Sequence, residues 1–203
     1  MQTIVNTIPG YRVYEYLLVL RPQEELRNRM VKVKEDFSVK YKTGKTISGG
    51  SQIILASFAQ YAMKEERIIN RLQAVAMGYP PFKVELKDFG SFPSHTICIN
   101  VNSKLPIQNL VKEIRKESQR LMKLSNDNKP HFILDPHFTI ATKLRPWQYE
   151  KGWLEYSKKH FNGWFIASGM SLLKRAAGEM KYHLVQQLEF QHLPVITRQG
   201  ELF

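Results

Sequence analysis

The stretch Pro136-His137-Phe138-Thr139-Ile140-Ala141-Thr142 carries a histidine and a threonine two residues apart in a run that favours β-structure. Side chains alternate along a strand, so His137 and Thr139 project from one face while Phe138 and Ile140 project from the other. An imidazole exchanges protons near neutral pH, and a hydroxyl donates a hydrogen bond to a phosphoryl oxygen. The pair predicts a half-site for phosphate, although a lone strand histidine is more often structural.

The residues before this stretch form a series of strand and helix patterns. Val13–Leu20 predicts a buried strand, and a helix is expected from about Gln23, with a face formed by Leu26, Met30, Val33 and Phe37. The glycines and lysines of residues 38–50 predict a basic loop, and Gln52–Phe58 predicts the next strand. The half ends with a helix whose face carries Ile68, Leu72 and Val75, a strand at Phe82–Lys87 and a turn at 88–91.

The second half repeats this order. Its elements are a strand at Thr96–Val101, a helix face with Leu110, Ile114 and Leu121, the strand around His137, a further helix, and strand-like runs near 171–173 and 182–190. The further helix contains Trp147, Trp153 and Tyr156, whose helical spacing predicts side chains in the core. Pro22 and Pro106 lie 84 residues apart, and the same offset relates the first helix face to the second. The pattern predicts a duplicated α+β unit in one domain, 1–203, with lobes at about 12–91 and 95–190. Exchange of terminal strands between the lobes is left open.

Composition predicts a folded, basic protein. The chain has 203 residues, of which 43% are hydrophobic and 24% charged, as in ordinary soluble domains. Its net charge of +12 should attract polyanions such as RNA or nucleotides. No apolar run is long enough to span a membrane and no signal peptide is recognised, so we expect a cytoplasmic protein without membrane association. The single cysteine, Cys98, agrees with a reducing compartment and is expected to be a buried strand residue. A monomer is assumed.

In this setting Pro136–Ala141 resembles the second motif of the 2H phosphoesterases, in the 2′-5′ RNA ligase-like and cyclic phosphodiesterase family. The resemblance spans most of the chain. It implies a bilobal α+β fold with pseudo-twofold symmetry, mainly antiparallel sheets around a central cleft, and helices outside. It also implies that each lobe supplies one His-x-Thr or His-x-Ser strand, with one histidine as general base and the other as general acid on 2′,3′-cyclic phosphates or 2′-5′ linkages. Neither a metal nor a cofactor is implied.

The first motif of that pair is degenerate. Ser94-His95-Thr96 places histidine and threonine next to each other, so the two side chains face opposite sides of a strand and cannot hold one phosphate. The repeat instead relates Gln52 to His137 and Ile54 to Thr139, each 85 residues apart. Glutamine does not exchange a proton near neutral pH, and isoleucine offers a phosphate no hydrogen bond.

The expected site therefore has one intact half and one eroded half. His137 and Thr139 are the expected catalytic residues, and Lys143, Arg145 and Lys45 are the expected additional phosphate contacts. Loss of one acid–base partner lowers the rate by roughly 10²–10⁴-fold, so ligand binding should survive better than catalysis.

Three functions remain open at this point. The first is a 2H homologue that binds RNA ends, cyclic phosphates or nucleotides in the interlobe cleft, with catalysis weakened or lost. The second is an active RNA 2′,3′-cyclic phosphodiesterase that uses His137 with a substitute partner, such as His95 or a lysine of the basic loop. The third is an interaction scaffold with a vestigial cleft, which apolar side chains around Ile54 would favour.

Two further patterns are set aside. His131, Asp135 and His137 are close in sequence but lack a fourth ligand, so no metal is expected. The helix at 111–124 carries Lys112, Arg115, Lys116, Arg120 and Lys123. A basic face of this kind is more commonly solvated than bound to RNA.

Overall fold

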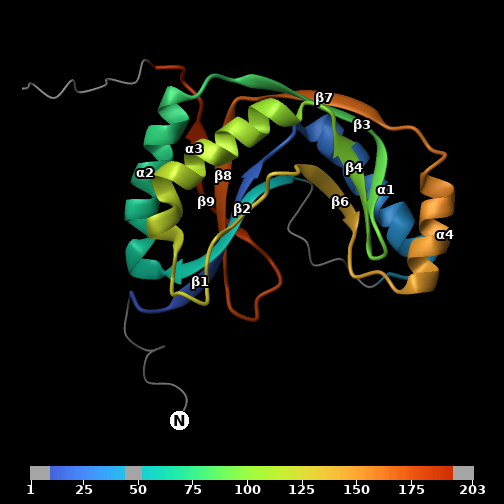
Figure 1. Ribbon diagram of the computed structural model, residues 1–203, viewed down its shortest axis with the longest axis horizontal. Coiled ribbons are helices and arrows are strands. Elements are labelled where there is room, and N and C mark those ends of the chain that lie inside the picture. Colours follow the sequence, from blue (N-terminus) through green and yellow to red (C-terminus); the bar gives the residue numbers. More distant parts are fainter. Residues whose placement is uncertain (1–9, 44–51, 194–203) are drawn as a thin grey trace, which may run out of the picture.

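The computed structural model describes residues 10–43 and 52–193, which form two β-sheets and four α-helices (Figure 1). The strands are β1 (Val13–Leu20), β2 (Ile53–Tyr61), β3 (Phe82–Phe92), β4 (Thr96–Val101), β5 (His131–Phe132), β6 (His137–Ala141), β7 (Asn162–Ala167), β8 (Gly169–Ala176) and β9 (His183–Glu189). The helices are α1 (Glu24–Tyr41), α2 (Glu65–Gly78), α3 (Lys104–Met122) and α4 (Pro146–Tyr156), with a 3-10 turn at Ala62–Lys64. Within these ranges no helix is long and apolar enough to cross a membrane.

Each half of the chain contributes strands to both sheets. Sheet A has the order β5-β2-β1-β8-β9, and sheet B has the order β6-β4-β3-β7, with all neighbouring strands antiparallel. β3 comes from the first half but pairs with β4, and β8 comes from the second half but pairs with β1. The predicted α+β class with antiparallel sheets is confirmed.

Helices cover one face of each sheet. α2 and α3 pack on sheet A, whereas α1 and α4 pack on sheet B (Figure 1). The helix positions that the repeat relates are buried in both helices, as Leu26 and Met30 of α1 and Leu110 and Ile114 of α3 show. Burial of these apolar faces supplies the main stabilisation of the layers. We call the side of each sheet that faces away from its helices the open face.

The first helix is longer than its pattern predicts. The loop expected from Ser38 is wrong at its start, because α1 continues to Tyr41. Tyr41 is 6% exposed, and its ring centroid lies 4.6 Å from that of Phe37. Burial of this ring outweighs the modest helix preference of Ser38 and Val39. Lys42 and Thr43 follow the helix, and residues 44–50 of the expected loop lie outside the described residues.

The turn predicted at 88–91 is wrong, because this segment forms a β-bulge. β3 continues to Phe92, and its register with β4 shifts between Leu86 and Phe89. Asp88 has a φ of 55°, a left-handed value that aspartate tolerates better than most residues. Its carboxylate accepts a hydrogen bond from the backbone N–H of Phe161 at 3.3 Å. The turn-forming residues thus bend the strand without ending it.

Two strands and one side chain differ from the sequence pattern. β5 and β7 are not predicted, and in β7 Trp164 and Ile166 are 57% and 52% exposed. Apolar residues therefore occupy both faces of β7, which hides the alternation that marks a strand. Trp147 was expected in the core but is 43% exposed, whereas Tyr156 of the same helix is buried.

Candidate phosphate-binding site

β2 and β6, the strands that the repeat relates, lie side by side at the centre of the molecule (Figure 1). β2 belongs to sheet A and β6 is an edge strand of sheet B. The junction of the two sheets therefore brings together two segments that are more than 70 residues apart in sequence.

The ring of His137, the first residue of β6, has contacts on two sides. Its Nδ1 lies 2.8 Å from the backbone oxygen of Asp135, and its ring centroid lies 4.7 Å from that of Phe92. A carbonyl oxygen only accepts hydrogen bonds, so Nδ1 is the donor here and the Nδ1–H tautomer is favoured. Nε2 is then the nitrogen that can accept a proton or a ligand hydrogen, as a general base requires.

Thr139 shares the face of β6 that carries His137. Both are half-buried, whereas Phe138 and Ile140 are 1% and 0% exposed and belong to the main core. Thr139 lies opposite Cys98 of β4, and its hydroxyl has no hydrogen-bond partner in the described parts of the chain. The predicted alternation is confirmed, and the hydroxyl is available to donate to a phosphoryl oxygen.

β2 presents a different pair of side chains. Gln52, directly before the strand, is 8% exposed, and Ile54 is half-buried. Ile54 packs in a small group on the open face of sheet A, separate from the main core, which we call the open-face cluster. Its members are Leu17, Val19, Ile54, Leu173 and Tyr182. Ile54, which the repeat relates to Thr139, is therefore an apolar residue that also has mainly apolar neighbours.

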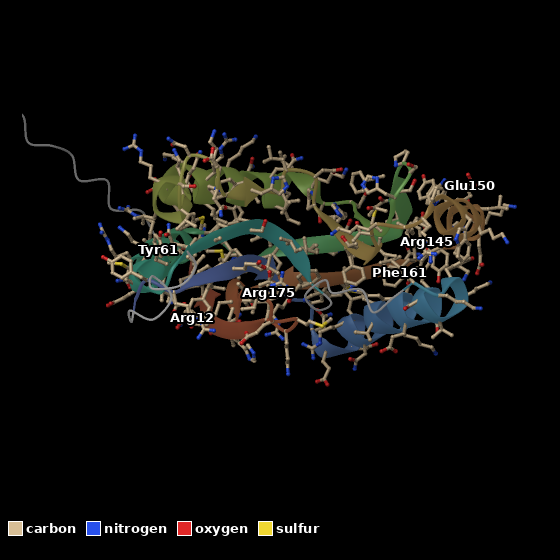
Figure 2. All side chains as sticks on the ribbon, turned by 90° about the horizontal axis from the view of Figure 1, so that it is seen from below. Arg12, Tyr61, Arg145, Glu150, Phe161 and Arg175 are labelled. Atoms are coloured by element: carbon tan, nitrogen blue, oxygen red, sulfur yellow. The ribbon has the colours of Figure 1, made fainter. Side chains whose placement is uncertain are left out.

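A hollow of about 490 Å³ adjoins this cluster. Its lining residues are Glu15, Tyr16, Leu17, Ser57, Phe58, Ala59, Asn128, Lys129, His131 and Tyr182. Glu15 accepts a hydrogen bond from Arg175 Nε at 2.7 Å, and the Arg175 guanidinium lies 4.6 Å from the Tyr182 ring centroid. Figure 2 shows Arg175 near the middle of the molecule. The hollow thus has a mixed lining, with apolar side chains such as Leu17 and Phe58, the ion-paired carboxylate of Glu15, and two basic side chains, Lys129 and His131.

The profile of the 2′-5′ RNA ligase superfamily matches residues 53–179, more than half of the sequence. The chain belongs to the 2′-5′ RNA ligase superfamily. The matched range begins at β2 and includes β6, so it contains both strands of the candidate site. The resemblance inferred from the His-x-Thr stretch is confirmed. No curated protein matches the sequence.

Solved structures of similar fold include two bacterial proteins. Escherichia coli LigT complexed with 3′-AMP has a TM-score of 0.60 and 15% identity, covering 88% of this chain and 98% of LigT. The protein TT0787 of Thermus thermophilus has a TM-score of 0.65 and 14% identity, covering 87% of this chain and 98% of TT0787. LigT complexed with ATP has a TM-score of 0.57 and 16% identity, covering 88% and 99%. At such identities the likeness establishes a shared fold.

The predicted basic contacts follow β6. Lys143 is exposed, with a φ of 54°, and Arg145 is exposed at the start of α4. The backbone N–H of Arg145 donates to Gln148 Oε1 at 2.9 Å, which fixes the start of that helix. Figure 2 places Arg145 near one end of the molecule. Lys45 lies outside the described residues, and the roles of all three stay predictions.

His95 is exposed in the turn before β4, one residue short of the strand on which the sequence pattern placed it. Its backbone N–H donates to the Phe92 oxygen at 3.2 Å, and its own oxygen accepts from the Leu144 N–H at 3.0 Å. Within the described ranges the structure gives no hydrogen bond or ring contact between His95 and His137.

Sequence reasoning assigned no site role to Phe92 and considered His131 only as a metal ligand. His131 lies opposite Ser57 in the β2–β5 register, and Ser57 lies opposite Leu17, which places His131 on the open face beside the hollow. The described residues contain no group of three or more potential metal ligands. Only the strand pairing of β5, which is too short to recognise in the sequence, reveals the position of His131.

Proposed function

We propose that this member of the superfamily binds the phosphate of a nucleotide or RNA end beside β6, with 2H-type catalysis weakened or lost. The observation that carries the proposal is the difference between the two related strands. β6 presents His137 and Thr139, whereas β2 presents Gln52 and Ile54.

The intact half supports phosphate binding. A protonated His137 would donate from Nε2 while Nδ1–H stays on the Asp135 carbonyl, so the ring keeps one orientation in both protonation states. The Thr139 hydroxyl would supply a second donor from the same face. Two convergent donors of this kind suit the non-bridging oxygens of a phosphate.

The eroded half argues against efficient turnover. An acid–base mechanism needs a second group that gives or takes a proton, and Gln52 has none. Ile54 lies among apolar side chains, so a phosphate oxygen placed there would lose water without gaining a donor. Binding at β6 would therefore persist where proton transfer from β2 fails.

The ligand class rests on the charge and on the relatives. LigT has been crystallised with 3′-AMP, NADP+, ATP and phosphate. The net charge of +12 of this chain favours the same kind of anionic ligand.

Calorimetry with 3′-AMP and chromatography of 2′,3′-cyclic AMP test the proposal on the native protein, His137→Ala and His183→Ala. His183 is exposed on β9 and serves as the matched control. We expect native protein and control to bind 3′-AMP, His137→Ala to bind at least tenfold more weakly, and cyclic AMP to be hydrolysed slowly or not at all.

Fast hydrolysis that depends on His137 would contradict weakened catalysis and favour the active phosphodiesterase. His131→Ala would then be the first variant to examine, because His131 faces the neighbouring hollow. Absence of binding to 3′-AMP, phosphate and RNA in the native protein would favour the interaction scaffold, to which the open-face cluster lends support.

A further inference from the structure

A second basic site lies on the outer side of the helix layer of sheet A. α2 and α3 pack side by side there and form a groove of about 670 Å³. Its lining residues are Arg67, Asn70, Arg71, Ala74, Lys116, Glu117, Arg120 and Leu121. Four of these are cationic and one is a carboxylate. Because the helices separate this groove from the sheet, it is distinct from the open face that carries His137.

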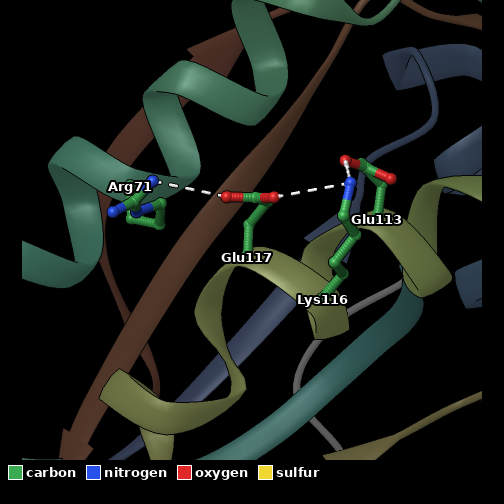
Figure 3. Close-up of polar contacts among 4 residues, drawn as sticks. All are labelled: Arg71, Glu113, Lys116 and Glu117. Atoms are coloured by element: carbon green, nitrogen blue, oxygen red, sulfur yellow. Dashed lines mark hydrogen bonds and ion pairs between the residues drawn. The ribbon is translucent and has the colours of Figure 1, made fainter. Parts of the chain in front are cut away.

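The cations form two rows, one on each helix. Arg67 and Arg71 are four residues apart on α2, as are Lys116 and Arg120 on α3, which separates neighbours in a row by about 6 Å along the axis. Glu117 lies between the rows, 3.3 Å from Arg71 and 3.7 Å from Lys116 (Figure 3). Within the described parts of the chain, Arg67 and Arg120 make no ion pair.

Stability alone does not favour this arrangement. Like charges four residues apart on a helix destabilise it by roughly 0.2–0.5 kcal/mol per pair, and each row contains such a pair. The one carboxylate of the groove, Glu117, pairs with Arg71 and Lys116, and Lys116 also pairs with Glu113 at 3.2 Å (Figure 3). In the described parts of the chain this leaves the guanidinium groups of Arg67 and Arg120 without an ion pair. A polyanion in the groove would remove this repulsion and release its own counterions.

We propose that the α2–α3 groove binds the sugar–phosphate backbone of a single RNA strand, without preference for base sequence. Its lining contains no aromatic side chain on which a base could stack, and arginine and lysine recognise phosphate without reading bases. A strand fits a recessed groove with two cationic rows, whereas the nearly flat surface of a membrane would not enter it. This site goes beyond the function proposed for β6 and does not depend on it.

The main test compares Arg67→Gln/Arg120→Gln with Lys151→Gln/Lys158→Gln, both carrying two fewer positive charges than the native protein. Lys151 and Lys158 are exposed on or beside α4, away from the groove. The probe is a fluorescein-labelled 20-nucleotide uridine RNA, titrated at several salt concentrations by anisotropy. We expect the groove variant to bind roughly tenfold or more weakly at 0.1 M salt. A plot of the logarithm of the association constant against the logarithm of the salt concentration has a negative slope. Its magnitude should decrease by about 1.4 in the groove variant, because two phosphate contacts are lost and each contributes about 0.7. The control should change less than threefold.

Glu117→Gln supplies a test that damage to the fold cannot mimic. It frees Arg71 and removes one negative charge from the groove, while Lys116 keeps its ion pair with Glu113, so we expect it to tighten RNA binding by threefold or more. The proposal is overturned if the groove and control variants weaken RNA binding equally, if Glu117→Gln leaves it unchanged, or if the groove variant loses binding only to phosphatidylserine vesicles. Binding of 3′-AMP should be unaffected by every groove variant and sensitive to His137→Ala, so failure of one site is distinguishable from failure of the other.

Discussion

Ile54 lies directly opposite Val19 in the β1–β2 register, on the open face of sheet A. The repeat relates this position to Thr139 on β6, which is half-buried and shares its strand face with His137. Leu17 and Leu173 complete the contact on the sheet A side. The side chains around Ile54 are thus suited to a hydrocarbon and not to a hydroxyl. A threonine at this position would therefore change the packing as well as the chemistry.

The double change Gln52→His with Ile54→Thr is expected to raise 2′,3′-cyclic phosphodiesterase activity by about 10²-fold or more. It supplies a second proton carrier and a second phosphate donor on a strand beside β6. The free energy of unfolding should fall by roughly 1–2 kcal/mol, because the ethyl branch of Ile54 is replaced by a hydroxyl inside the open-face cluster. Product formation from 2′,3′-cyclic AMP and urea unfolding measure the two effects.

Two controls separate chemistry from packing in that experiment. Ile54→Val should cost somewhat less stability, roughly 0.5–1.5 kcal/mol, and bring no gain in activity, since it removes a methylene and adds no donor. Adding His137→Ala to the double change should abolish the gain. A stably folded double variant with no gain in activity on cyclic or 2′-5′-linked substrates would mean that the site lacks more functional groups than those of residues 52 and 54. That outcome would favour an interaction scaffold.

Gly152→Ala is expected to destabilise the protein by roughly 1–3 kcal/mol, although alanine normally stabilises a helix relative to glycine. A Cβ at this position of α4 would lie 2.8 Å from two ring atoms of Phe37 and 3.1 Å from Ile97 Cδ1. α4 can therefore approach α1 and sheet B this closely only without a side chain at 152. Urea unfolding tests the effect, with Lys151→Ala on the exposed side of α4 as control. Equal stability of Gly152→Ala and the native protein would show that Phe37 can move aside.

Periodicity was sufficient to predict most of the architecture. The helix faces at Leu26 and Leu110 and the strand at Thr96–Val101 all occur where apolar spacing placed them. The bulge at Asp88 was not predictable, because a short run of turn-forming residues looks the same whether it ends a strand or bends it. β7 is not predicted, because its exposed positions carry the apolar residues Trp164 and Ile166, so polar and apolar residues do not alternate along the strand.

The sequence predicts less of the candidate site than of the fold. His137 and Thr139 were recognisable because a strand puts residues two apart on one face. The contact of Phe92 with His137 depends on how β3 and its turn fold over sheet B, and the placement of His131 depends on a two-residue strand. Such long-range relations leave no periodic signal in the sequence.

Cys98 is expected to resist alkylation in the folded protein. The thiol is 2% exposed, and burial raises its pKa to about 11, so the reactive thiolate is scarce at pH 8. Reaction with iodoacetamide, followed by mass spectrometry, should be at least roughly 10²-fold slower than in urea-unfolded protein. Similar rates in the two states would show that the open face of sheet B opens readily around this residue.

Glu155 connects α4 to α1 through an ionised carboxylate. It forms ion pairs with Lys40 at 2.6 Å and Lys159 at 2.8 Å, and it accepts a hydrogen bond from the Tyr41 hydroxyl. Hydrogen bonds from Lys159, Lys40 and Tyr41 lower the pKa of Glu155 to about 2 from its ordinary 4.5.

The contribution of Glu155 to stability should therefore depend on pH in a defined window. Because the carboxylate has a lower pKa in the folded protein than in the unfolded chain, its contribution is complete above about pH 4.5 and is lost as the pH falls through about 2. We expect Glu155→Gln to lower the free energy of unfolding by roughly 1 kcal/mol at pH 7, since the two lysine partners are largely solvent-exposed, and by progressively less towards pH 2. Urea unfolding at pH 7, 4 and 2.5 measures the difference. Glu150→Gln is the matched control, because Glu150 is exposed on the same helix and makes no ion pair within the described ranges. A deficit for Glu155→Gln that persists unchanged at pH 2.5 would show that packing of the side chain, and not its charge, holds α4 against α1.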